Sequence, residues 1–335
     1  MRRELVWAIV IGISFGLIIA FGVWRINSSL NKSKSGFPQA TPDSQNPQTE
    51  FKITLNTPGE NSVVTDTPVT VSGITKPLTW VVVSGESGDY ILQSDEKGIF
   101  SQEVELTPGV NRIKITAFDP KGSQSLQKVL VVYSSVFQLK TVVPPTPGDA
   151  ATGDAAIREK VAQKVAEAMS QPKAYLGIVT DITSSTIQIK NPESQIEQIS
   201  IGSEGVAVIN TTGTVNKTVK LTDIAIGDFI VAMGYIDGNQ VLVSQRILIT
   251  NPVEDPKLSV SMGRVTKTST KTLTVSDIKT GETGTLTPSK NTVIASFANG
   301  KTNTIKITGL KTDNLIVYVT DQSGTSPFIR SIFSI

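Results

Sequence analysis

Short runs of alternating apolar and polar residues fill the stretch 51–133. Gly, Pro, Asn and Asp separate these runs, which include "FKITLN", "PVTVSG", "WVVVSG", "FSQEVEL", "NRIKITAFD" and "KVLVVY". Alternation with a period of two places successive side chains on opposite faces of a strand, so each run predicts a β-strand with one buried face. Several short strands at regular spacing predict a β-sandwich over residues 51–135.

The second half of the chain repeats itself. An ungapped offset of 86 residues pairs "YLGIVTDITSSTIQIKNP" with "SMGRVTKTSTKTLTVSDI", and "VKLTDIAIGDFIVAMGY" with "IKITGLKTDNLIVYVTD". Each unit carries several strand patterns in roughly 80 residues, which is enough for a small closed or nearly closed barrel. We therefore expect two tandem β-barrels, at residues 172–252 and 257–335.

Two carboxylates lie beside apolar strand patterns in the first unit, where they could be catalytic acids or turn-formers. The offset aligns Asp223 with Gly309 and Asp228 with Asn314, so neither carboxylate recurs in the second unit. Asp, Asn and Gly share a tolerance of turn conformations, and Asp and Asn can also bond their own backbone. The repeat therefore favours turns at both positions.

An uncharged run, "LVWAIVIGISFGLIIAFGVW", extends from Leu5 to Trp24. At a rise of about 1.5 Å per residue its helix reaches about 30 Å, the thickness of the hydrocarbon core of a bilayer. Trp7 and Trp24 lie near its ends, where indole rings favour the interface. A cleaved signal peptide is the alternative, but the run is long for one and no small-x-small site follows it. We expect an uncleaved anchor at 5–24 after a tail of residues 1–4.

Three further segments connect these parts. Residues 25–50 are rich in Ser, Asn, Gln and Pro and predict a flexible tether, and 136–153 read as a Pro- and Gly-containing linker. Asp154 can cap a short amphipathic helix at 154–171, which ends before Pro172. Its apolar stripe consists of Ile157, Val161, Val165 and Met169. The stripe could bind a partner, but its narrowness favours packing against the next domain.

Composition removes most familiar catalysis. The chain has no Cys and no His, which excludes thiolate nucleophiles, disulfides, imidazole bases, the ordinary zinc and iron ligand sets and a lipidated cysteine. It has no Walker loop and no G-x-G-x-x-G, and "TDTP" at 65–68 is better explained as a turn than as an aspartic protease motif. We predict no enzyme activity, no catalytic residue and no cofactor.

Oxygen ligands alone can hold calcium, and Asp89, Asp95 and Glu96 are close together in the sequence of the expected sandwich. Their spacing does not match an EF-hand. A solvated acidic loop is the commoner explanation, so we predict no metal site.

The two repeats differ in charge. Residues 173–256 contain 5 Lys/Arg and 9 Asp/Glu, a net of −4, whereas residues 257–335 contain 10 and 4, a net of +6. The second unit could bind a polyanion, although lysines spread over a solvated surface are commoner. The candidate polyanion-binding residues are Arg264, Lys267, Lys271, Lys301, Lys306, Lys311 and Arg330.

Binding of single-stranded nucleic acid would also need exposed aromatic side chains beside these cations. Phe297, Tyr318, Phe328 and Phe333 are available in the second unit, but several of them fall at core positions of the strand pattern. Nucleic acid is therefore the weaker choice of polyanion.

Residues 51–135, with "TPGENSVVTDTPVTVSGITKP", "DEKGIF", "LTPGVNRIKITAFDPKGS" and "VLVVY", resemble bacterial Ig-like domains. Both repeats, with G-x-V-x-x-I at 177–182 and "GDFIVAMG" at 227–234 in the first, resemble small OB-like β-barrel domains of exported bacterial proteins. The resemblance implies a mainly β protein with an Ig-like sandwich and two barrels, together with a transmembrane helix and a short amphipathic helix. Such modules are extracytoplasmic, which implies a cytoplasmic N-terminus and a chain that otherwise lies outside.

These observations predict a noncatalytic, membrane-anchored scaffold or adhesion-type binding protein at the cell surface. Its expected contacts are the membrane, through Leu5 to Trp24, and a cell-wall polymer or envelope protein. Two alternatives remain open: polyanion or nucleic-acid binding through the basic second repeat, and service as an accessory subunit of an envelope enzyme or secretion complex.

Overall fold

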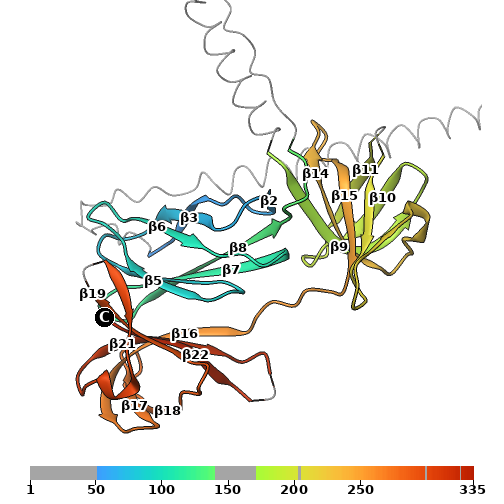
Figure 1. Ribbon diagram of the computed structural model, residues 1–335. Helices are drawn as coiled ribbons and strands as arrows, with labels where there is room; N and C mark the ends of the chain where they lie inside the picture. The colour runs from blue at the N-terminus through green and yellow to red at the C-terminus, as the bar shows by residue number, and fades with distance from the viewer. Residues whose placement is uncertain (1–50, 140–170, 203–204, 299, 325) are drawn as a thin grey trace, which may run out of the picture. The chain divides into compact units, whose positions relative to one another are not determined.

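The computed structural model describes residues 51–139, 171–202, 205–298, 300–324 and 326–335 (Figure 1). The expected anchor at 5–24, the tether at 25–50 and the helix at 154–171, except Gln171, lie outside these residues. Within the described part, no helix is long and apolar enough to cross a membrane. The described residues are mainly β, as the alternation predicts.

Eight strands form two sheets in the first module. They are β1 (Thr54–Thr57), β2 (Ser62–Val64), β3 (Val69–Ile74), β4 (Trp80–Ser84), β5 (Asp89–Gln93), β6 (Ile99–Val104), β7 (Gly109–Phe118) and β8 (Gln124–Tyr133). One sheet has the order β1-β3-β6, and the other contains β5-β4-β7-β8-β2. Val71 and Phe100 of the first sheet share one core with Val81, Ile115 and Val131 of the second. The sequence pattern missed β2 and β5, which are short.

The first repeat forms a closed ring of hydrogen-bonded strands. Its elements are β9 (Lys173–Ile182), β10 (Thr186–Lys190), β11 (Ile196–Ile201), β12 (Ala207–Asn210), β13 (Lys217–Val219), a 3-10 helix (Leu221–Asp223), β14 (Phe229–Ile236) and β15 (Leu242–Thr250). Strand β9 pairs with β10 and β14, β10 pairs with β11, and β14 pairs with β15. A parallel pair, β11 with β15, closes the ring around a core that includes Ile187, Ile230 and Ile247.

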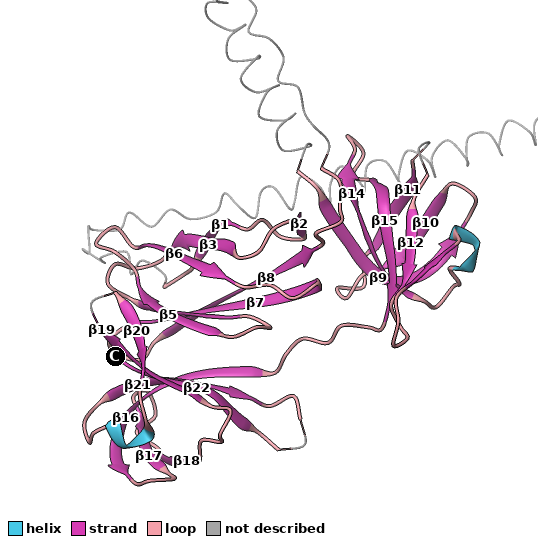
Figure 2. Ribbon diagram, in the orientation of Figure 1, coloured by secondary structure: helices cyan, strands magenta, loops and turns pink. Residues whose placement is uncertain are grey.

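The second repeat has the same elements in the same order. They are β16 (Leu258–Thr268), β17 (Leu273–Asp277), β18 (Thr283–Leu286), β19 (Val293–Ala298), β20 (Lys301–Thr304), a 3-10 helix (Ile307–Gly309), β21 (Leu315–Asp321) and β22 (Phe328–Ser334). Figure 2 shows one 3-10 helix in each repeat, and their first residues, Leu221 and Ile307, are 86 positions apart. The predicted tandem repeat is confirmed.

The two repeats differ in whether the ring of strands closes. In the described residues of the second repeat, the sheet order is β18-β17-β16-β21-β22-β19-β20, and β18 pairs with β17 alone. The strands equivalent to the closing pair of the first repeat, β18 and β22, are therefore not joined. The second repeat is an open sheet where the first is closed.

Both repeats pack the same outer face against the sandwich. Ala174, Leu176, Val231 and Met233 of the first repeat form a cluster with Val63 and Val132 of the sandwich. Their counterparts 86 positions later, Val260, Met262, Val317 and Val319, form a cluster with Val82, Ile91 and Phe118. Strands β4 and β14 are therefore buried on both faces, which explains their unbroken apolar runs "WVVV" and "FIVAMGY".

The sandwich sheet continues into the first repeat through backbone hydrogen bonds. Ser62 of β2 pairs with Lys173 of β9, the Val63 amide donates to the Pro172 carbonyl over 3.0 Å, and the Ala174 amide donates to the Asn61 carbonyl over 2.8 Å. The short strand β2, which the sequence pattern missed, is thus the element that links the two modules.

The aspartates of the repeat are turn-formers. The Asp228 carboxylate accepts a hydrogen bond of 2.9 Å from the Ala225 amide, and its counterpart Asn314 accepts one of 2.7 Å from the Lys311 amide. The Asp223 carboxylate accepts one of 2.8 Å from the Lys220 amide. Each side chain therefore closes a local turn, as the alignment of the repeats predicts.

A substitution at Asp228 separates a turn-former from a catalytic acid. Asp228→Ala removes the acceptor of the Ala225 amide and should lower the free energy of unfolding by about 1 kcal/mol. Asp228→Asn keeps an acceptor oxygen, as Asn314 does in the second repeat, and should leave stability almost unchanged. Urea denaturation of residues 51–335, which form one compact unit, measures both changes. Equal losses for the two variants would contradict the turn assignment.

Candidate functional site

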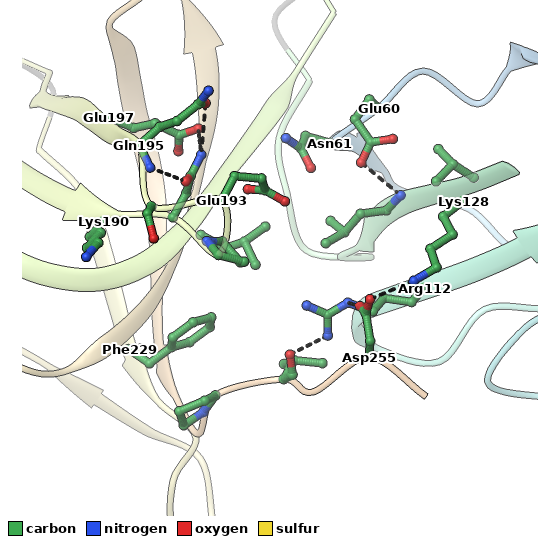
Figure 3. Close-up of a pocket in the computed structure, with 18 of the residues that line it drawn as sticks. Glu60, Asn61, Arg112, Lys128, Lys190, Glu193, Gln195, Glu197, Phe229 and Asp255 are labelled. Atoms are coloured by element: carbon green, nitrogen blue, oxygen red, sulfur yellow. Dashed lines mark hydrogen bonds and ion pairs between the residues drawn. The ribbon is translucent and has the colours of Figure 1, made fainter. Parts of the chain in front are cut away.

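A cleft of about 780 Å³ is the candidate site (Figure 3). Strands β7 and β8 of the sandwich form one side, and the loop between β10 and β11 of the first repeat forms another. Residues 252–256, which connect the two repeats, also line it. Apolar lining comes from Leu130, Leu176, Ile178 and Phe229. The cleft therefore lies where three parts of the chain meet.

Cations of the sandwich hold the connection between the repeats. Asp255 receives the Arg112 guanidinium at 2.7 Å on one carboxylate oxygen and the Lys128 ammonium at 2.9 Å on the other. Arg112 also donates to the carbonyl of Val253, and Lys114 donates to the carbonyl of Leu258. Figure 3 shows Arg112 and Lys128 converging on Asp255 from neighbouring strands.

These contacts, together with burial, shift the pKa values of Asp255 and Lys114. The hydrogen bond from Lys128 and the positive charges of Arg112 and Lys128 hold the pKa of Asp255 below its ordinary value, against the opposing effect of burial. Burial lowers the pKa of Lys114, and the charge of Lys128 lowers it further. The connection is thus held by a carboxylate that stays ionised and by cations that share one face of the sheet.

Carboxylates accept hydrogen bonds on both sides of the cleft. Glu60 accepts a hydrogen bond of 3.1 Å from the Leu130 amide, and Glu197 accepts one of 3.0 Å from the Asn191 amide group. Burial raises the pKa of both carboxyl groups, and repulsion from Glu193 raises each further. Asn191 in turn accepts from the Gln195 amide at 2.8 Å, which fixes the loop.

The arrangement cross-links modules. Arg112, Lys114 and Lys128 tie the connection between the repeats to the sandwich, while the Lys173 ammonium of the first repeat donates to the Glu60 carbonyl of the sandwich. Among the described residues, no group of three or more Asp, Glu, His or Cys is placed to hold a metal ion. The sequence reasoning did not single out these cleft residues, because they become neighbours only when the three parts pack together.

A second ion pair joins the sandwich to the second repeat. Arg330 approaches Asp89 at 3.4 Å, with only 16% of the arginine side chain and 2% of the aspartate side chain exposed. Arg330 also donates to the Gly85 carbonyl at 2.8 Å, and the Ser331 hydroxyl donates to Asp89 at 2.7 Å. Two sequence-based expectations are corrected here: Arg330 does not belong to a free polyanion-binding surface, and Asp89 is not part of a solvated loop.

The other predicted cations remain on the surface. Arg264 and Lys267 lie on β16, Lys271 lies in the turn before β17, Lys301 begins β20, and Lys306 and Lys311 flank the 3-10 helix; all six are exposed. Arg264 donates to the Asp313 carbonyl at 2.9 Å. These residues are distributed over several elements of the second repeat.

The aromatic side chains do not form a common stacking surface. Phe333 lies in the core shared with the sandwich, and Phe297 packs edge-on against Trp80 with ring centroids 5.1 Å apart. Tyr318 packs against the core of its own repeat, whereas Phe328 is exposed. Phe297 and Phe333 are therefore packed against the core, as the strand pattern favours for several of these aromatic residues, and do not offer a stacking surface.

The other two acidic residues considered as calcium ligands, Asp95 and Glu96, make no joint site with Asp89. Asp95 accepts hydrogen bonds from the Lys97 amide at 2.9 Å and from the Ile99 amide at 2.7 Å, so it shapes a turn. Glu96 is exposed beside it. With Asp89 paired to Arg330, the three residues do not converge on one point.

Loss of the Asp255 carboxylate should loosen the connection between the repeats. Asp255→Asn should lower the free energy of unfolding by about 1 kcal/mol, because the pair is partly exposed to solvent, and should speed tryptic cleavage after Lys257. The folded-state pKa of Asp255 is depressed, so its contribution is present above its ordinary value of 3.8 and is lost as the pH falls through the lower folded-state pKa. The two proteins should therefore converge in stability in acid.

Glu254→Gln, at an exposed neighbour, is the matched control and should change neither measurement. Unchanged cleavage of the Asp255→Asn protein would contradict the clamp.

Breaking the second ion pair should cost more. Asp89→Ala leaves the nearly buried Arg330 guanidinium without its carboxylate and should lower the free energy of unfolding by about 3 kcal/mol. The double variant Asp89→Ala/Arg330→Met removes both charges and should recover a large part of that loss. Urea midpoints measure the cycle, with Lys267→Ala as the exposed control. A double variant less stable than Asp89→Ala alone would show that the pair is not coupled.

Comparisons with known proteins leave the family open. No family model and no curated protein matches the chain. A tetra-tandem repeat from the extending region of a large adhesion protein aligns at 12% identity over 84% of this chain and 72% of that one, with a TM-score of 0.21. A Ca²⁺-stabilised ice-binding adhesin of an Antarctic bacterium aligns at 15% identity over 84% and 72%, with a TM-score of 0.19. Domains of Drosophila Unr align at 12% identity over 78% and 98%, with a TM-score of 0.17. At these values the likeness establishes neither a common fold nor a common function.

Proposed function

We propose that the chain is a noncatalytic scaffold or adhesion-type binding protein, anchored through Leu5 to Trp24 and displayed outside a bacterial membrane. The observation that carries the proposal is the cross-linking of three β modules by the polar groups of the cleft and of the second ion pair. A displayed scaffold must present its outermost module in a defined way. Its binding target is a cell-wall polymer or an envelope protein.

The cross-links act on the segment that would otherwise be the weakest. Residues 251–257 lie between the two repeats and form no regular secondary structure. Arg112 and Lys128 hold Asp255 of this segment, and Lys114 holds the first residue of β16. The second repeat is thus fixed at its start by this clamp and near its end by Arg330 and Asp89. Two attachment points restrain a module far better than a single connection.

We further propose that the modules are an Ig-like sandwich and two OB-like units. Two sheets around one core support the first assignment. The second is supported by the ring order of the first repeat, in which β9 pairs with β10 and β14, and β11 pairs in parallel with β15. The second repeat keeps this order except for the closing pair.

Protease treatment of spheroplasts tests the display. Full-length protein with a C-terminal epitope tag should be cleaved by trypsin in the tether, where Lys32 and Lys34 lie, and a fragment containing the β modules should be released into the medium. Ile13→Arg/Leu17→Arg places two charges in the apolar run, so that variant should not insert and should be protected until lysis. Resistance of the unaltered chain in spheroplasts, with cleavage after lysis, would place the modules inside and overturn the proposal.

A further inference from the structure

Three large aliphatic residues are exposed at one end of the sandwich. Ile74, Leu78 and Ile99 are 53%, 55% and 46% exposed. Ile74 ends β3 and lies directly opposite Ile99, which begins β6, so the two form a cross-strand pair on the outer side of the three-stranded sheet. Leu78 lies in the loop that continues from Ile74. We call the two loops at this end, residues 74–79 and 94–99, the apolar tip.

The exposure is built into the fold, because hydrogen bonds fix both loops. The Thr75 amide donates to the Gly98 carbonyl at 2.8 Å, and the Ser94 amide donates to the Thr79 carbonyl at 2.9 Å. The Ser94 hydroxyl oxygen accepts from the Thr79 amide at 2.9 Å, and both side chains are buried. The loops therefore hold Leu78 out from a rigid base.

Leu78 also has a strained backbone. Its φ angle of 54° lies in the left-handed region, which Gly or Asn adopts far more easily than a bulky aliphatic residue. Stability alone would favour a smaller residue at this position. Strain combined with exposure of a large apolar side chain points to a surface that contacts something.

The tip lies where the chain enters the sandwich. Phe51 is the first described residue, and the Lys76 ammonium lies 5.0 Å from the centre of its ring. Thr54 of β1 pairs with Ile74. Residues 25–50, the predicted tether, connect Trp24 to this end, and a coil of that length would span about 30 Å on average. An anchor at 5–24 would therefore keep the tip close to the lipid surface.

We propose that the apolar tip inserts into the outer lipid surface of the membrane that holds the anchor. The inference rests on the proposed anchor. Ile74, Leu78 and Ile99 enter the boundary between headgroups and acyl chains, while Lys52, Lys76 and Lys97 lie at the level of the lipid phosphates. A short tether gives an effective concentration on the order of millimolar, so a contact too weak to recruit a free protein still forms.

The absence of cysteine makes a site-specific test direct, because one introduced thiol gives one label. Glu96→Cys places a fluorophore at the tip without altering the aliphatic residues. The full chain is reconstituted in vesicles of phosphatidylcholine and phosphatidylglycerol that contain nitroxide-labelled lipid. The tip label should be quenched, and the same label at Val215→Cys, an exposed apolar position in the first repeat, should not.

Ile74→Ser/Leu78→Asn in the Glu96→Cys background should abolish the quenching. Both residues are exposed and Asn tolerates the backbone conformation of Leu78, so the variant should keep or raise its denaturation midpoint, which is measured in parallel. Quenching that survives this substitution would overturn the proposal, as would equal quenching at Glu96→Cys and Val215→Cys. An unquenched tip label that instead shows proximity to a second tip label would assign the surface to a second copy of the chain and also overturn it.

A label at Ile13→Cys separates failure of the anchor from failure of the tip. Quenching at Ile13→Cys without quenching at Glu96→Cys would reject the tip and leave the anchor standing. An unquenched Ile13→Cys would reject the anchor, and with it a tip that depends on the tether.

Discussion

Burial of one β-sheet on both faces is the constraint on which the rest of the described structure depends. One face of the sheet β5-β4-β7-β8-β2 covers the sandwich core with Val81, Val83 and Ile115, and the other receives the two repeats through Val82, Phe118 and Val132. Apolar burial is the main favourable term in folding and increases with the area removed from water. The sheet therefore contributes twice, once to its own module and once to the attachment of its neighbours.

Duplication explains how one sheet accepts two partners. Leu176 and Val231 dock the first repeat, and Met262 and Val317, 86 positions later, dock the second. Between the two docked faces the sandwich sheet carries Arg112, Lys114 and Lys128, which bind the segment that connects the repeats. Polar contacts thus lie on the part of the sheet that neither repeat covers, and they determine the path of the segment that connects the repeats. Buried apolar area attaches the repeats to the sandwich, and the charged groups hold the connecting segment in place.

The same logic explains which site residues could be read from the sequence. Asp228 and Asn314 could be identified as turn-formers because each bonds an amide three residues away, and local hydrogen bonds leave a local pattern. Arg330 and Asp89 lie far apart in the chain, and nothing near either residue indicates its partner. Lys114 and Lys128 lie opposite one another, with Arg112 on the same face of the sheet, and such a group of cations indicates a polar contact. Nothing near these residues in the sequence indicates their partner, Asp255.

The sequence by itself determined most strands of the sandwich, the tandem repeat and the turn chemistry, because these depend on periodicity and on interactions between close neighbours. It also predicted a membrane anchor at 5–24 and a tether at 25–50, and both remain predictions. Only the tertiary structure decided that β2 joins the sandwich to the first repeat, that the second repeat is open where the first is closed, and that Arg330 is an internal cross-link. These features depend on which surfaces meet, and contacts between distant segments are set by the packing of whole modules rather than by any local pattern.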